Sequence, residues 1–188
     1  MNQQEVLSRL QEGNARFVDD KLEHNLQDSA RRGDLTGGQA PWAVVLSCAD
    51  SRVVPEQTFD TGLGELFVLR VAGNVANTST IASIEYAIAH LGTEVIVVMG
   101  HQSCGAVTAA IGGGDNGYNL NHLLSHIEPA KAAAESDDVN VVVKKNAELT
   151  CGELLARSAI LKKAHDDGKL KLVPAYYNLD SGKVDFLD

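Results

Sequence analysis

The sequence predicts a single α/β domain over residues 1–188, built around a mostly parallel β-sheet. Short apolar runs at residues 42–46, 66–71 and 94–99 have the uninterrupted hydrophobic character of strands buried on both faces. Residues 80–91, between the last two runs, have apolar side chains at helical spacing. A strand–helix–strand unit of this kind requires a right-handed crossover, which makes its strands parallel. The chain is long enough for one well-buried core and too short for two ordinary domains.

Residues 1–40 are expected to lie outside the sheet. Apolar side chains at roughly helical spacing predict a helix over residues 3–18, with Gly13 as its weak point. Residues 19–40 are polar and contain several glycines, which predicts a long irregular arm that lies on another surface. Residues 1–40 would thus form an N-terminal helix and arm, and residues 41–188 the α/β core.

The second half of the chain is expected to be helical up to a closing pair of strands. A helix is expected to open at residues 104–111, and residues 120–134 and 141–167 are expected to be largely helical. Strands are expected at residues 170–177 and 183–186, joined by a turn at residues 180–182. Pro174 cannot donate a hydrogen bond to a β ladder, so its strand lies at a sheet edge or bends there.

The composition favours a soluble globular protein and excludes several kinds of partner. Apolar residues make up 44% and charged residues 22% of the chain, which argues against disorder. The net charge of −9 gives no general electrostatic case for binding nucleic acid or anionic membranes. No signal peptide and no membrane-spanning apolar run is expected. Three cysteines in such a chain indicate reduced thiols in the cytoplasm, free to bind a metal.

Two clusters of reactive side chains come directly after predicted strands. Cys48 follows the first strand, and His101 and Cys104 follow the third. In an open α/β sheet, ligands bind beyond the carboxyl ends of strands, so the two clusters can meet in space. Two thiolates and one imidazole suit Zn²⁺, and three protein ligands leave a fourth position open, as in catalytic sites. Either cluster alone equally fits ordinary packing, but their shared placement favours zinc.

Asp50 and Arg52 strengthen the zinc interpretation. Their spacing points both side chains the same way on an extended segment, where the guanidinium keeps the carboxylate ionised and fixed. The pair could simply brace a loop. Beside an open zinc site, Asp50 would instead accept a hydrogen bond from a zinc-bound hydroxide and orient it. A third possibility is that Asp50 becomes the fourth zinc ligand, which would expel the water and inactivate the site.

Several motifs resemble those of the β-class carbonic anhydrases. They are Cys-Ala-Asp-Ser-Arg at 48–52, Gly-Glu-Leu-Phe-Val at 64–68, Arg-Val-Ala-Gly-Asn at 70–74, Ser-Ile-Glu-Tyr-Ala at 83–87 and Gly-His-Gln-Ser-Cys-Gly-Ala at 100–106. The resemblance implies four parallel strands with a fifth antiparallel strand, N-terminal helices that wrap a partner subunit, and a homodimer or homotetramer. It also implies one Zn²⁺ per chain on Cys48, His101 and Cys104, and a catalytic pair of Asp50 and Arg52.

Within that family, the resemblance indicates a pocket that leaves zinc open to water. Gln39 stands nine positions before the first zinc cysteine, as in the pocket type that also has an aromatic residue and a tyrosine, here Phe67 and Tyr86. The other type has a tryptophan three positions before that cysteine and binds bicarbonate non-catalytically, but Val45 occupies this position here. Ligation of zinc by Asp50, in a closed state only, ranks second.

The activity that the resemblance implies is reversible hydration of carbon dioxide to bicarbonate and a proton, by attack of zinc-bound hydroxide. Gln39 and the backbone of Gly105 would hydrogen-bond the substrate oxygens. The chain could alternatively hydrolyse carbonyl sulfide or carbon disulfide at the same site, or be a non-catalytic zinc protein that senses bicarbonate. A thiol redox protein is a further alternative, but the sequence lacks a C-x-x-C pair, and Cys151 fits a buried free thiol.

Overall fold

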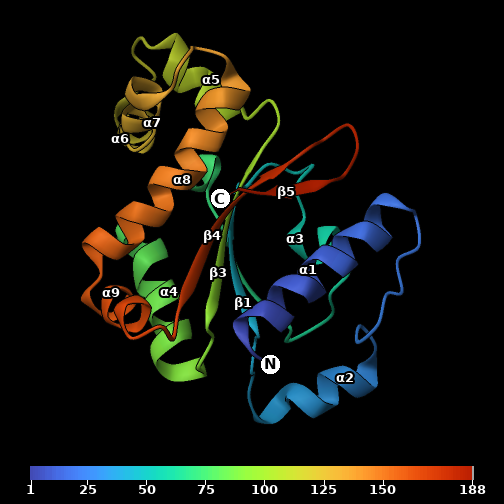
Figure 1. Ribbon diagram of the computed structural model, residues 1–188. Coiled ribbons are helices and arrows are strands. Elements are labelled where there is room, and N and C mark those ends of the chain that lie inside the picture. Colours follow the sequence, from blue (N-terminus) through green and yellow to red (C-terminus); the bar gives the residue numbers. More distant parts are fainter. Residues whose placement is uncertain (188) are drawn as a thin grey trace.

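A five-stranded sheet forms the centre of the chain, as described by a computed structural model that covers residues 1–187 (Figure 1). The strands are β1 (Ala43–Ser47), β2 (Leu66–Arg70), β3 (Val95–His101), β4 (Lys171–Tyr177) and β5 (Val184–Phe186). Their order across the sheet is β2-β1-β3-β4-β5, in which β1 to β4 are parallel and β5 is antiparallel to β4. The predicted α/β fold, with four parallel strands and a fifth antiparallel strand, is confirmed.

The chain changes direction across the sheet next to β1. It passes from β1 to β2 on one side and then crosses back to form β3 on the other side of β1. β1 and β3 are in register, with Ser47 opposite Met99, so both strands end at the same edge. Open α/β sheets bind ligands at such a point, where the connections diverge. The residues that follow Ser47 and Met99 are therefore brought to one place.

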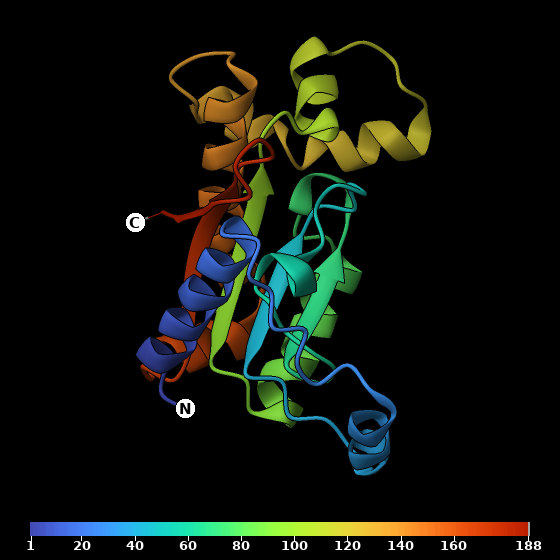
Figure 2. The ribbon, with the colours of Figure 1, turned by 90° about the vertical axis from the view of Figure 1, so that its right-hand side faces the viewer.

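Helices cover both faces of the sheet (Figures 1 and 2). One face carries α4 (Thr78–Leu91), α8 (Val139–Arg157) and α9 (Ala159–Asp166), and the other carries α1 (Gln3–Val18) and α3 (Pro55–Thr58). On the first face, Ile84, Leu154 and Leu161 pack with side chains of β1 and β3. On the second, Leu10 and Phe59 pack with the alternate residues of these strands. Both faces of β1 and β3 are thus buried, as their uninterrupted apolar runs predict.

A third group of helices lies beyond the carboxyl ends of the strands. It comprises α5 (Gly105–Gly112), α6 (Tyr118–Ser125) and α7 (Glu128–Ala133). Residues 120–134 are largely helical as expected, but they form two helices, because α6 stops at Ser125 and α7 begins at Glu128. Pro129 explains the break, since it has no N–H to donate to the carbonyl of Ser125.

The largely helical stretch expected over residues 141–167 likewise consists of two helices. α8 ends at Arg157, and Ser158 adopts an extended backbone with φ −127° and ψ 113°. The Ser158 hydroxyl accepts a hydrogen bond from the backbone N–H of Leu161, which starts α9. Within residues 1–187, no helix is both long and apolar enough to span a membrane.

The arm over residues 19–40 is less irregular than predicted. It contains α2 (Ser29–Asp34) and a 3-10 turn, η1 (Leu35–Gly37). The Asp28 carboxylate starts α2 by accepting a hydrogen bond from the backbone N–H of Arg31. A cap rather than an apolar period marks this helix, which is why hydrophobic spacing misses it. No side chain of the arm is buried in the chain, so the arm has no core of its own.

Pro174 lies inside β4, at the point where one side of that strand becomes free. Its carbonyl accepts a hydrogen bond from the N–H of Leu187, and β5 pairs only with residues 175–177. The N–H that proline lacks would point to the same side as this carbonyl, away from β3. The ladder between β3 and β4 therefore loses no hydrogen bond, although β4 lies between β3 and β5 and is not an edge strand, one of the two arrangements expected for proline.

Gly13 is not a weak point of α1, contrary to expectation. A Cβ at this position would lie 2.0 Å from the backbone carbonyl oxygen of Phe59, so the helix packs too closely for any side chain. We expect Gly13→Ala to destabilise the fold by about 2 kcal/mol, because α1 must shift. Urea unfolding measures this effect. Gly152→Ala in α8 is the control, since a Cβ there meets no atom within 4 Å and should cost nothing.

Candidate metal centre

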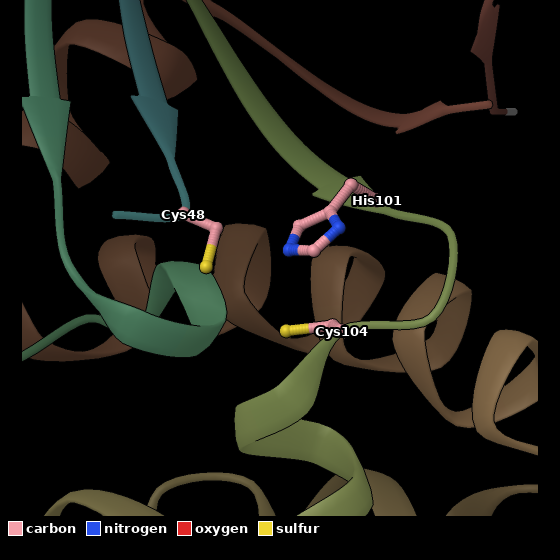
Figure 3. Close-up of side chains that lie close together, drawn as sticks. All are labelled: Cys48, His101 and Cys104. Atoms are coloured by element: carbon pink, nitrogen blue, oxygen red, sulfur yellow. The ribbon is translucent and has the colours of Figure 1, made fainter. Parts of the chain in front are cut away.

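Cys48, His101 and Cys104 converge at the carboxyl edge of the sheet (Figure 3). Cys48 follows β1, His101 is the last residue of β3, and Cys104 directly precedes α5. Their ligand atoms, two sulfurs and a ring nitrogen, all lie within 4.8 Å of one another. The three residues are buried, with exposed fractions of 4%, 0% and 1%. The structure thus brings together the three ligands predicted from the two strand ends.

The imidazole of His101 is oriented for a metal. Its Nδ1 lies 2.9 Å from the backbone carbonyl oxygen of Gln102 and donates a hydrogen bond to it. This bond fixes the tautomer that leaves the lone pair on Nε2. Nε2 is buried and has no hydrogen-bond partner among residues 1–187. A cation satisfies such a lone pair, and two sulfurs with one imidazole nitrogen are a donor set that fits Zn²⁺.

The two thiols of the cluster are unequal acids. A hydrogen bond between them lowers the pKa of Cys48 and raises the pKa of Cys104, which burial raises further. The backbone N–H of Gly73 also lowers the pKa of Cys48, and the Gly73 nitrogen lies 3.4 Å from the Cys48 sulfur. A divalent cation would take the place of the shared proton and hold both sulfurs as thiolates.

Asp50 and Arg52 form an ion pair beside the cluster. Nε and Nη2 of Arg52 donate to the two carboxylate oxygens of Asp50 at 2.9 and 2.7 Å. These bonds hold the pKa of Asp50 well below its usual range. The segment is a turn and not extended as expected, because the N–H of Val53 bonds the carbonyl of Asp50. Asp50 Oδ2 nevertheless lies 3.7 Å from Nε2 of His101, so the carboxylate faces the cluster.

Arg70 holds the backbone of this ligand loop. Its Nε donates to the carbonyl of Cys48 at 3.1 Å, and its Nη2 donates to the carbonyl of Asp50 at 2.6 Å. One guanidinium thereby fixes the 48–49 and 50–51 peptide groups. Sequence reasoning misses this role. The signal for it is positional, because Arg70 ends β2 opposite Ser47 and so lies beside the loop that follows β1.

The loop between His101 and Cys104 is braced from two sides. Ser103 has a left-handed backbone, with φ 54°, and its N–H donates to the side-chain oxygen of Asn140 in α8 at 2.9 Å. The side-chain oxygen of Gln102 accepts a hydrogen bond from the N–H of Leu179 at 2.9 Å, in the turn between β4 and β5. Asn140 and Leu179 lie outside the motif, so its sequence does not indicate them.

Three of the predicted pocket residues lie apart from the cluster of their own chain. Gln39 is exposed and precedes β1, whereas Cys48 follows it. Phe67 is the second residue of β2 and pairs with Val44, about 13 Å from the level of Cys48 at the usual rise per residue. Tyr86 is 49% exposed, and its ring centroid lies 6.5 Å from that of Phe67. A pocket role for these residues stays a prediction.

Gly105 is the predicted pocket residue that the chain itself places at the cluster. It is exposed and begins α5, directly after Cys104. The first N–H groups of a helix have no partner within the helix. The backbone N–H of Gly105 is therefore suited to donate a hydrogen bond to a small ligand beside the metal position.

The fold and the site together define an α/β protein with a candidate three-ligand metal centre at the switch point of its sheet. A family model described as carbonic anhydrase matches residues 43–184. Carbonic anhydrase 2 of Mycobacterium tuberculosis is 37% identical over 182 residues, which cover 93% of this chain and 88% of that protein. The β-carbonic anhydrase of Coccomyxa, solved in complex with acetazolamide, is 29% identical and superposes with a TM-score of 0.76. The match covers 96% of this chain and 86% of the Coccomyxa chain. The chain belongs to the β-class carbonic anhydrases.

Proposed function

We propose that the chain catalyses the reversible hydration of carbon dioxide to bicarbonate and a proton, with one Zn²⁺ held by Cys48, His101 and Cys104. The observation that carries this proposal is the unpaired, buried Nε2 of His101 beside two sulfurs and the Asp50 carboxylate. A structural zinc site has four protein ligands. This set has three, which leaves one coordination position for a reactant.

The residues around the metal position orient the reaction. When bound, zinc would supply a nucleophilic oxygen near neutral pH by lowering the pKa of water to about 7. Asp50 stays ionised because Arg52 donates to both of its oxygens. An ionised carboxylate at this place accepts a hydrogen bond from the attacking oxygen and so directs a lone pair toward the substrate carbon. The N–H of Gly105 donates to a substrate oxygen.

We infer that Asp50 would ligate the metal only in a closed, inactive state. Both of its carboxylate oxygens are engaged by Arg52, and it does not belong to the set of ligand atoms that lie within 4.8 Å of one another. Rotation of Asp50 toward the metal would break the bidentate ion pair. The intact pair with Arg52 therefore favours the open arrangement.

A second copy of the chain completes the substrate pocket in this proposal. Gln39, Phe67 and Tyr86 are exposed or half-exposed and remote from the cluster of their own chain. Strand β2, which carries Phe67, is the edge of the sheet, and none of its residues is fully buried. A homodimer or homotetramer would cover this edge and bring these side chains to a neighbouring centre. A solved β-carbonic anhydrase of Sordaria macrospora, 24% identical with a TM-score of 0.76, is a tetramer.

We place the enzyme in the cytoplasm. Cys48, Cys104 and Cys151 are all free thiols. A compartment that keeps thiols reduced is the one in which two of them remain available to a metal.

Stopped-flow hydration of carbon dioxide, with zinc measured in the same sample, tests the function. We expect about one zinc per chain, loss of hydration on chelation, and recovery when zinc is added back. A chain that holds zinc but does not hydrate carbon dioxide would be the non-catalytic bicarbonate sensor. Faster turnover of carbonyl sulfide or carbon disulfide than of carbon dioxide would identify a hydrolase. Redox activity without zinc would refute the metal site altogether.

A further inference from the structure

We propose that Asn146 of α8 is a positioning residue for the metal centre, acting through Gly73 on the Cys48 thiolate. This inference rests on the proposed metal site, but Asn146 touches no ligand itself. Its side-chain Nδ2 donates to the backbone carbonyl of Gly73 at 2.8 Å. The N–H of the same Gly73 donates to the Cys48 sulfur, with 3.4 Å between nitrogen and sulfur. One amide side chain thus anchors the residue that supplies a hydrogen bond to a metal ligand.

The turn that carries Gly73 needs such an anchor. It is a short 3-10 turn, η2 (Ala72–Asn74), in which Gly73 has φ 71° and Asn74 has φ 45°. Glycine adopts this conformation freely and asparagine tolerates it, so the two residues permit the turn without fixing its position. Within the turn, the N–H of Asn74 bonds back to the carbonyl of Val71, so this bond leaves the Gly73 carbonyl to a partner outside the turn.

The surroundings hold Gly73 from two directions. A Cβ on Gly73 would lie 2.8 Å from Cδ1 of Ile127, so apolar packing closes one side. Asn146 supplies the polar restraint and is itself only 2% exposed. A buried carbonyl that loses its donor is costly, and the backbone moves to find a new partner. Removal of the Asn146 amide would therefore displace the Gly73 peptide group.

Displacement of this peptide group raises the electron density on the Cys48 sulfur, because a hydrogen bond to a thiolate withdraws charge from it. The Gly73 nitrogen lies 3.4 Å from the Cys48 sulfur, an ordinary length for a hydrogen bond to sulfur, and the bond depends on the N–H staying directed at the sulfur. A shift or rotation of the Gly73 peptide group therefore weakens it. Without that bond the thiolate lone pairs rise in energy. A metal whose thiolate-to-metal charge-transfer band can be recorded reports this rise in lone-pair energy directly, since the band moves to longer wavelength.

The test is Co²⁺ substitution in the full-length chain with Asn146→Leu and Asn146→Ser. Leucine is close in size and cannot donate, and serine is too short to reach the Gly73 carbonyl. We expect the sulfur-to-cobalt band to move to longer wavelength in both variants. Competition with a chelator should show zinc held about tenfold more weakly, as is usual for the loss of an outer-shell partner.

Asn14 offers the matched control. It is also a buried asparagine, 5% exposed, and its Nδ2 donates to the backbone carbonyls of Thr58 and Gly182 on the opposite face of the sheet. Asn14→Leu should lose stability yet leave the cobalt band and zinc affinity unchanged. If the wild-type chain binds cobalt and both Asn146 variants have the same band position as Asn14→Leu, the role of Asn146 is refuted and the proposed function stands. A wild-type chain that binds neither metal overturns the proposed function as well.

Discussion

Replacing Cys48 by serine is expected to abolish both zinc binding and carbon dioxide hydration. Serine has nearly the same size, but its hydroxyl stays protonated at neutral pH and is a poor ligand for zinc. Two remaining ligands, His101 and Cys104, do not hold the metal against dialysis. Hydration then falls to the uncatalysed rate, a loss on the order of 10⁶-fold. Metal analysis after dialysis and stopped-flow assays of the same sample measure the two effects.

Cys151→Ser is the matched control for this substitution. Cys151 lies in α8, outside the cluster, and burial raises the pKa of its thiol to about 12, so it stays protonated at neutral pH. This variant should keep about one zinc per chain and wild-type hydration. Wild-type zinc content in Cys48→Ser, or loss of zinc in Cys151→Ser, would contradict the ligand assignment.

The ligands can be predicted from the sequence because each is attached to a strong local pattern. The apolar runs of β1 and β3 are buried on both faces, and their ends locate Cys48 and His101 at one edge once the strands are parallel. The order of the five strands is a long-range property. Periodicity does not carry this order, and the family resemblance implied only four parallel strands with a fifth antiparallel strand.

The partners of the ligand loops could not be predicted in this way. Arg70, Asn140 and Asn146 each hydrogen-bond a backbone atom in a segment far along the chain. Every residue has a backbone carbonyl, and all but proline have an N–H, so the bonded segment carries no sequence signal for its partner. The boundary between α8 and α9 at Ser158 is hard to predict for a similar reason. The apolar spacing continues past Ser158, and only the hydrogen bond that its hydroxyl accepts from the N–H of Leu161 marks the start of a new helix.

The pocket residues show a second limit. Gln39, Phe67 and Tyr86 are indicated by family resemblance alone, and the geometry of one chain does not assemble them around the metal position. A site shared between subunits leaves half of its residues exposed in each isolated chain. Their exposure therefore agrees with the proposed oligomer, and light scattering on the purified protein is the direct check of its size.

Asp50→Asn is expected to lower kcat for hydration about 100-fold while zinc stays bound. Asparagine has the shape of aspartate, but its neutral amide accepts hydrogen bonds weakly and presents Nδ2 to the donors of Arg52. The attacking oxygen loses its orienting acceptor, and the metal ligands are untouched. Asp167→Asn is the control, because Asp167 forms an exposed pair with Lys163 at 2.8 Å on α9 and should change nothing. Unchanged turnover in Asp50→Asn would remove the orienting role.

Arg52→Gln tests whether the pair acts as one unit. Arg52 holds the pKa of Asp50 well below its usual range, so its removal raises that pKa only toward the ordinary acidic value. Asp50 remains ionised at neutral pH, and the loss of activity should be the same from neutral to alkaline pH. The activity is lost because the carboxylate is no longer held in one orientation. Asp50 Oδ2 lies only 3.7 Å from Nε2 of His101, so a carboxylate freed from Arg52 can rotate toward the metal position. The double variant should lose no more activity than Asp50→Asn alone, whereas multiplicative losses would show that the two residues act independently.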